Sequence, residues 1–192
     1  MRRCPPPQPE VFSPLPKPAF TRDPRVLARW ERRLSLLADE RGYLLQATLT
    51  FVNTRPFYDP TARAALKAFL VRFLPVFAVK FEADLQPAGF FFFHAHLLVP
   101  ITMEIYPFLL AVKNLGAKSR RLTYRGKRLP APFTLFRRAK AKDLPDLTGL
   151  ETLVDFRAST IATLRNSPDL SRYLAKRTYL GGLSPVLTHN LN

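Results

Sequence analysis

The sequence has little of what extracellular and membrane proteins use. Its 192 residues include one cysteine, Cys4, so an internal disulfide and a cysteine-based zinc site are both excluded. No apolar run reaches the roughly 18 residues that indicate a transmembrane helix. The N-terminal residues lack the apolar core of a secretory signal peptide. We therefore expect a cytoplasmic protein of one domain that has no membrane partner.

Acidic residues are also scarce. The chain has 14 Asp and Glu against 30 Lys and Arg, a formal net charge of +16. This imbalance predicts a polyanionic partner, most simply nucleic acid, with an anionic membrane surface as the rival.

The excess of positive charge is concentrated between Ile105 and Lys142, a stretch without any acid. Tyr124, Phe133 and Phe136 are interleaved with the basic residues. This combination suits single-stranded nucleic acid, because its phosphates bind cationic side chains and its nucleobases stack on aromatic rings. The alternative is a solvated basic loop or hairpin. Seven basic residues of the stretch are the candidate DNA contacts: Arg120, Arg121, Arg125, Lys127, Arg128, Arg137 and Arg138.

Histidine is rare too, yet two of the three lie in one apolar run. Residues 90–99 read Phe-Phe-Phe-Phe-His-Ala-His-Leu-Leu-Val and precede Pro100, which is typical of a buried strand. Alternate side chains of a strand share a face, so His94 and His96 point the same way. Two imidazoles in this arrangement make half of a metal site. The alternative is a pair of core histidines, each needing a hydrogen-bond partner.

Two further segments alternate as strands, at residues 44–52 and 76–84, and the connection at residues 85–89 permits a hairpin into the histidine strand. Matching their faces predicts one antiparallel sheet. One face is apolar, and we expect helices at 23–41 and 59–74 to cover it. The other face carries the polar residues Thr48, Thr50, Glu82, Asp84, His94 and His96.

Capping signals place the remaining helices. Thr102 begins a short helix that ends near Gly116, and Thr148 with Glu151 forms a capping box ahead of a helix predicted through Leu164. Ser167, followed by a proline, begins the last helix, which we expect to run to Gly181. Tyr173, Lys176 and Arg177 fall on one side of it. Residues 1–20 hold seven prolines and read as an extended arm, and residues 184–192 read as a tail without pattern.

Three segments in this order resemble the three motifs of the HUH endonucleases, in particular the rolling-circle replication initiators. They are Thr-Leu-Thr at 48–50, His-Ala-His at 94–96 and Tyr-Leu-Ala-Lys at 173–176. The resemblance covers roughly residues 44–180, and it assigns 21–183 to a nuclease domain. It implies an α+β fold, a central antiparallel sheet with helices packed on one face, of the ferredoxin-like or RRM-like kind.

The resemblance also implies a site. Members of this family commonly hold a divalent metal, Mn²⁺ or Mg²⁺, with the two histidines and a glutamate of the preceding strand, which here is Glu82. Whether Asp84 joins or replaces that glutamate stays open. Tyr173 would be the nucleophile that forms a 5′-phosphotyrosine link, with Lys176 assisting and Arg177 contacting phosphate. The position of a second tyrosine is taken by Arg177, which indicates a one-tyrosine enzyme.

The sequence therefore predicts a site-specific nickase and strand transferase of single-stranded or hairpin origin DNA, initiating rolling-circle replication of a plasmid or phage. We expect no helicase domain in 192 residues, so a host helicase would be a partner. Relaxases and one-tyrosine transposases use the same chemistry. The alternative from another class is a non-catalytic binder of single-stranded nucleic acid on a ferredoxin-like sheet, with the histidines in its core.

Overall fold

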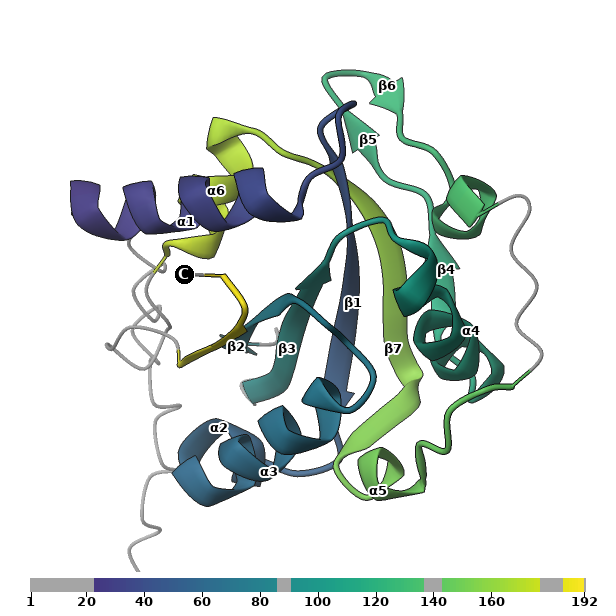
Figure 1. Cartoon of the computed structure of the whole chain (residues 1–192). Coiled ribbons are helices and arrows are strands. Elements are labelled where there is room, and N and C mark those ends of the chain that lie inside the picture. Colours follow the sequence, from purple (N-terminus) through teal and green to yellow (C-terminus); the bar gives the residue numbers. More distant parts are fainter. Residues whose placement is uncertain (1–22, 86–90, 137–142, 177–184, 192) are drawn as a thin grey trace, which may run out of the picture.

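The computed structural model describes residues 23–85, 91–136, 143–176 and 185–191 (Figure 1). The helices are α1 (Pro24–Leu37), α2 (Arg55–Tyr58), α3 (Pro60–Val71), α4 (Tyr106–Asn114), α5 (Thr148–Glu151) and α6 (Pro168–Leu174), with 3₁₀ turns η1 (Met103–Ile105) and η2 (Pro132–Phe136). The strands are β1 (Tyr43–Phe51), β2 (Phe77–Leu85), β3 (Phe91–Val99), β4 (Lys118–Arg120), β5 (Thr123–Tyr124), β6 (Lys127–Arg128), β7 (Val154–Arg165) and β8 (Val186–His189).

Six of these strands form one sheet in the order β4-β7-β1-β3-β2-β8. The pairs β7–β1, β1–β3, β3–β2 and β2–β8 are antiparallel, whereas β4 runs parallel to β7, so the sheet is mixed. The β1, β2 and β3 strands were predicted within one or two residues, and their antiparallel pairing is confirmed. The predicted α+β class is also confirmed, and the arrangement is compatible with a ferredoxin-like nuclease fold.

One face of the sheet carries the main core. Leu49 of β1, Phe81 of β2 and Leu97 of β3 are fully buried there, among the residues that the alternation predicted to be apolar. The α3 and α4 helices cover this face with Leu66, Leu70, Phe108 and Val112. Each fully buried side chain of this size stabilises the fold by about 1.5–3 kcal/mol relative to an exposed one, so this face anchors the strands that hold the site.

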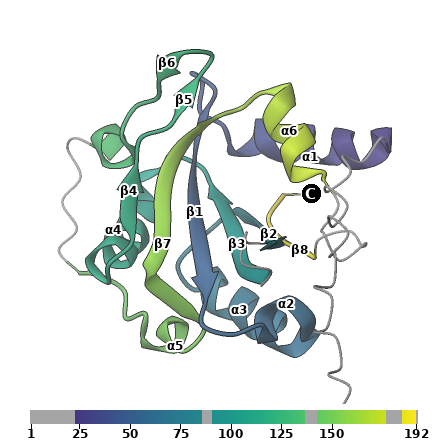
Figure 2. The same ribbon diagram turned by 180° about the vertical axis from the view of Figure 1, so that it is seen from behind.

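The opposite face is covered at one end by α1 and α6, which lie side by side (Figures 1 and 2). Trp30, Leu34 and Leu37 of α1 pack there on Leu98 of β3 and Leu174 of α6. The expectation that the helix at 23–41 covers the apolar face with the helix at 59–74 is therefore wrong. The physical reason is that the predicted polar face carries apolar residues at one end, Leu44 and Leu98 among them. The apolar side chains of α1 pack against these residues.

The helix predicted after Thr148 is also wrong. Only Thr148–Glu151 is helical, and the following segment is β7, a long strand that pairs with β1 along most of its length. A register shift between Thr48 and Thr50 of β1 interrupts the pairing. There the backbone N–H of Thr50 donates to the Ser159 hydroxyl at 3.0 Å, and the Thr50 hydroxyl donates to the Ala158 carbonyl at 3.1 Å. The bulge breaks the two-residue alternation that would have identified a strand.

The C-terminal part differs from the expectation as well. The last predicted helix ends at Leu174 instead of near Gly181, and the β8 strand, Val186–His189, pairs with β2 at the sheet edge where the sequence showed no pattern. The predicted arm at 1–20 lies outside the described residues, as do Arg137, Arg138 and Arg177. None of the described helices is long and apolar enough to cross a bilayer.

Candidate metal centre and tyrosine site

The β2 and β3 strands bring the predicted ligands together. Their register sets Glu82 opposite His94 and Lys80 opposite His96, so all four side chains point to the face that α6 partly covers. The two histidines and Glu82 are buried, with 5% or less of each residue exposed. The prediction that these three residues converge is confirmed.

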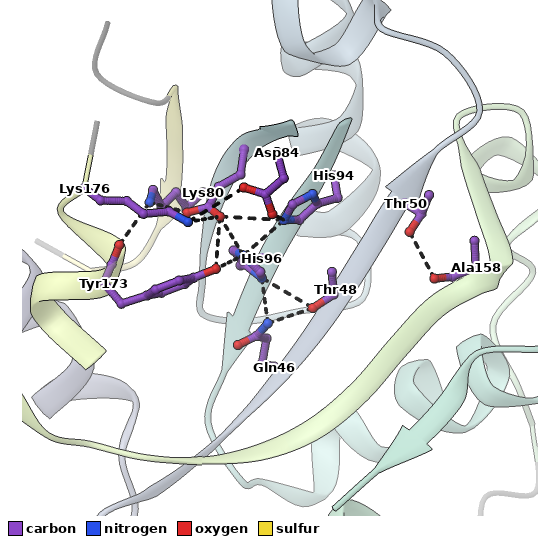
Figure 3. A network of polar contacts seen from close by, with 11 residues as sticks. Gln46, Thr48, Thr50, Lys80, Asp84, His94, His96, Ala158, Tyr173 and Lys176 are labelled. Atoms are coloured by element: carbon purple, nitrogen blue, oxygen red, sulfur yellow. Dashed lines mark hydrogen bonds and ion pairs between the residues drawn. The ribbon is translucent and has the colours of Figure 1, made fainter. Parts of the chain in front are cut away.

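Three ligand atoms face a common point. His96 Nε2 lies 3.1 Å from Glu82 Oε2, and His94 Nε2 lies 3.7 Å from the same oxygen. The two imidazoles face each other, with His94 Nε2 3.3 Å from His96 Nε2 (Figure 3). The Asp84 carboxylate is farther out, with Oδ2 3.8 Å from His94 Nε2 and a side chain that is 37% exposed. Glu82 is therefore the buried carboxylate of the group, and Asp84 borders it.

The donor set fits a metal ion. Two ligand atoms bonded to one cation at about 2.1 Å lie roughly 3.0 Å apart at a right angle and roughly 3.4 Å apart at the tetrahedral angle. Two of the three separations fall in that range, and the third exceeds it by only about 0.3 Å. Two imidazole nitrogens facing each other beside a carboxylate are also an arrangement that a cation satisfies. The buried Glu82–His94–His96 group could hold a metal ion.

The β1 strand orients His96 from behind. The Gln46 amide nitrogen lies 2.6 Å from His96 Nδ1 and donates to the Thr48 hydroxyl at 2.7 Å, and that hydroxyl lies 3.3 Å from the same Nδ1. The two residues hold the ring with Nε2 toward Glu82. A cation on Nε2 requires the proton on Nδ1, and the Gln46 amide accepts it once its oxygen faces the ring.

Tyr173 reaches this group from α6. The Ser167 hydroxyl accepts from the Leu170 N–H at 3.2 Å and caps the helix, Pro168 occupies the first turn, and Leu174 packs against the α1 stripe. The Tyr173 hydroxyl then lies 3.1 Å from Glu82 Oε2, to which it donates, and 3.2 Å from His96 Nε2. The predicted nucleophile and the predicted ligands are therefore in direct contact.

Two lysines surround the carboxylate. Lys80 is 1% exposed and forms an ion pair with Glu82 Oε1, and its ammonium also donates to the Tyr173 carbonyl at 3.3 Å. Lys176 Nζ lies 3.1 Å from Glu82 Oε2 and 4.2 Å from the centre of the Tyr173 ring. Lys176 is thus beside the phenol, as predicted, although it follows the end of α6 instead of lying on it.

These neighbours set the ionisation of the site. Burial by itself would raise the pKa of the Glu82 carboxyl, but the adjacent imidazoles of His94 and His96 and the charge of Lys80 outweigh it and hold that pKa below its usual range. Burial lowers the pKa of His96, against the pull of Glu82, which favours the neutral ring that binds metals. Burial and the charges of Glu82 and Asp84 raise the pKa of the Tyr173 phenol above its ordinary value.

A hollow of about 440 Å³ lies beside the ligands on the uncovered part of the sheet face. Its lining includes His94, His96, Tyr173, Phe92 and Arg120. The other described candidate DNA contacts, Arg121, Arg125, Lys127 and Arg128, are exposed on and before the β5–β6 hairpin, which turns through Arg125 and Gly126 with positive φ. Of the predicted contacts that the structure describes, Arg120 is therefore the one that lines the hollow.

Comparison with known families, proteins and structures gives no assignment for this site. No family model, curated protein or solved structure matches the chain. The interpretation of the site therefore depends on its residues alone.

Sequence reasoning missed two residues of the site. Lys80 and Gln46 alternate with the apolar residues of their strands and so share the polar face, but sequence reasoning gave them no role. The available signal for Lys80 was its position two residues before Glu82 and four before Asp84, because that spacing puts the three charged residues of the strand on one face. For Gln46 the signal was its position two residues before Thr48, in the strand now seen to border the histidines.

Proposed function

We propose that this chain is a metal-dependent endonuclease and strand transferase of single-stranded DNA, acting through a phosphotyrosine intermediate. The observation that carries the proposal is the contact of the Tyr173 hydroxyl with Glu82 Oε2 and His96 Nε2, at 3.1 and 3.2 Å. A nucleophile from one element and a metal-ligand set from two others meet at one point. For a tyrosine that only covers the surface of a helix, such contacts of its hydroxyl with a ligand imidazole and a ligand carboxylate would be a coincidence.

A divalent cation held by Glu82, His94 and His96 would act as a Lewis acid on the scissile phosphate, and its charge would oppose the carboxylates that raise the Tyr173 pKa. Two imidazoles with one carboxylate suit Mn²⁺, and Mg²⁺ is the second choice. Both metals keep positions for water or phosphate oxygens, which a cleavage site needs.

The chain's own residues supply the nucleophile and its support. The Tyr173 oxygen loses its proton and forms a bond to phosphorus while the bond from phosphorus to the 3′ oxygen breaks. The 3′ oxygen takes up a proton and leaves as a free hydroxyl, and the 5′ phosphate stays on the tyrosine. Because the phosphodiester is exchanged for another ester, the step can run backward onto a second 3′ end, which is strand transfer.

Lys176 supports the charge that develops in this step. Its ammonium lies 4.2 Å from the centre of the Tyr173 ring and 3.1 Å from Glu82 Oε2. A cation at this place favours the phenolate over the phenol and attracts the phosphate oxygens. Lys80 acts through position, since it ties the Tyr173 carbonyl to Glu82 on the β2 strand.

DNA is the partner that the charge favours. The net charge is +16, and Arg120 lines the hollow beside the ligands. The exposed basic residues of the β5–β6 hairpin follow it in the chain. Phe92 in the same hollow offers a ring on which a base can stack. We propose single-stranded or hairpin origin DNA as substrate, rolling-circle replication as the process and a host helicase as the partner that opens the duplex. A relaxase or a one-tyrosine transposase would use the same steps.

The test is a label-transfer experiment. A library of single-stranded oligonucleotides with a randomised centre is labelled at the 3′ end or at the 5′ end and incubated with the protein and Mn²⁺. A 5′-phosphotyrosine keeps only the 3′ label on the protein in a denaturing gel. We expect Tyr173→Phe to abolish this transfer and Tyr58→Phe, at an exposed tyrosine, to leave it intact. Binding of the oligonucleotides without transfer of either label would instead identify a non-catalytic binder.

A further inference from the structure

A second, smaller pocket lies next to the site. It measures about 270 Å³ and is formed by α1, the end of α6, β2 and β8. Tyr173 lines the hollow described above, whereas the residues that follow it, Leu174 to Lys176, line this pocket. The two spaces therefore share the end of α6 as a common wall.

Among the residues that the structure describes, the charged lining of this pocket is basic. It comprises Arg29 and Arg33 of α1, Lys80 of β2 and Lys176, and no described Asp or Glu lines it. Two of the four cations, Lys80 and Lys176, are paired with Glu82. The two arginines form no ion pair within the described part of the chain, so the pocket keeps an excess of positive charge.

Arg29 and Arg33 lie one helical turn apart on α1, so their positive charges repel each other. The Arg33 guanidinium lies over the Trp30 ring at 5.1 Å, in a half-buried position. Burial and the charge of Arg29 both lower the pKa of Arg33, which means that its charged form is disfavoured there. An anion in the pocket would remove this opposition and gain charge-assisted hydrogen bonds from both guanidinium groups.

Phosphate is the anion that fits these groups. Guanidinium groups bind phosphate oxygens in pairs through their planar forks, and clusters of arginine are the usual means of phosphate recognition. The position adds a source for the phosphate. Lys80 and Lys176 contact Glu82 on one side and the pocket on the other, so a strand whose scissile phosphate lies at Tyr173 has a neighbouring phosphate within reach of the same lysines.

We propose that the Arg29–Arg33 pocket binds a backbone phosphate of the single strand, next to the phosphate that is cleaved. The identity of the strand as its source rests on the proposed function, whereas the presence of a phosphate site does not. Free phosphate, alone or on a nucleotide, presents the same chemistry and is the other source that the experiment separates.

The experiment compares two double variants of the full chain. Arg29→Gln with Arg33→Gln removes both charges of the pocket, and Arg25→Gln with Arg32→Gln removes two charges from the exposed side of the same helix. Binding of a single-stranded oligonucleotide is measured by fluorescence anisotropy in EDTA, where metal-dependent cleavage does not run. Binding of inorganic phosphate is measured by calorimetry. Because neither readout needs a nicked product, failure of the nuclease proposal leaves this test interpretable.

We expect the pocket variant to lose about tenfold or more in oligonucleotide affinity, and the control variant at most about threefold. A single neutral methylphosphonate walked along the oligonucleotide should weaken binding of the wild type at one position, and this position should cease to matter in the pocket variant. If only inorganic phosphate distinguishes the variants, the source is free phosphate. If neither ligand distinguishes them, the inference is overturned. Arg29→Gln alone, at an exposed position, matched with Arg25→Gln, gives the same comparison should the double variant fold poorly.

Discussion

The Tyr173 hydroxyl donates a hydrogen bond of 3.1 Å to Glu82 Oε2, across 91 residues of sequence. This contact joins a phenol on a late helix to a carboxylate on a central strand. Neither residue alone distinguishes an enzyme from a binding protein. Their contact, beside two imidazoles that face the same oxygen, is the arrangement from which the proposed function follows.

Removal of a histidine tests the metal site. We expect His94→Ala to weaken Mn²⁺ binding by at least about 100-fold, because the imidazole is one of three protein ligands and its loss leaves two. Isothermal calorimetry on the metal-free protein measures the change. His189→Ala removes the imidazole of β8, which packs beside Phe77, and should leave the affinity unchanged. Equal affinities in the wild type and both variants would contradict a site at His94.

Gln46 provides a test of how His96 is oriented. We expect Gln46→Leu to weaken Mn²⁺ binding about 10- to 100-fold, since the partner of a ligating imidazole fixes its ring and tautomer. The same calorimetry measures the effect. Gln46→Glu, which keeps an acceptor for the Nδ1 proton, should retain binding. A Leu variant that binds as tightly as the wild type would show that the 2.6 Å contact with His96 has no role in metal binding.

Lys176 should have opposite effects on metal binding and on cleavage. Its ammonium lies 3.1 Å from Glu82 Oε2, where a cation would also bond. We expect Lys176→Met to tighten Mn²⁺ binding about tenfold, because a like charge is removed, and to slow label transfer at saturating metal. Lys113→Met, an exposed lysine with its ammonium near Phe133, is the control for both readouts. Weaker metal binding in the Lys176 variant would contradict this reasoning.

Lys80 should matter for stability without any metal. It is buried with Glu82, and its removal leaves the buried Glu82 Oε1 without a cation, while Lys176 still contacts Oε2. We expect Lys80→Met to lower the free energy of unfolding in EDTA by about 3 kcal/mol, measured with urea. Adding Glu82→Gln should recover part of the loss, because the remaining charge is then neutral. A loss as small as that of Lys118→Met, about 0.5 kcal/mol at an exposed site, would show that the pair is not coupled.

Much of the fold was readable from the sequence. The strands around Leu49, Phe81 and Leu97 alternate cleanly, and the Asp-Pro pairs begin α1 and α3 where expected, because each Asp side chain accepts the N–H two residues on. The β7 strand was misread since Val154, Ile161 and Leu164, together with Leu150 and Leu153 before the strand, also fit a helical stripe, and the bulge opposite Thr50 hides the alternation. Period alone does not decide between the two when a bulge intervenes.

The site was readable in part for a similar reason. Alternation placed Glu82 and both histidines on one face, and a strand face is a local property. The side of the sheet that α1 covers depends instead on which apolar part of the sheet the other helices leave uncovered. No single segment of the sequence specifies this. The role of Gln46 needed the pairing of β1 with β3, and the role of Lys80 needed the carbonyl of Tyr173. Contacts between distant segments were therefore what the sequence left out.

The most direct measurement is the location of the covalent adduct. The protein is incubated with Mn²⁺ and the single-stranded oligonucleotide pool, digested with trypsin and nuclease, and examined by peptide mass spectrometry. We predict one modified peptide, carrying a 5′-linked nucleotide on Tyr173, absent when EDTA replaces the metal. A nucleotide on a different tyrosine, or no adduct under conditions where the oligonucleotides bind, would contradict the account.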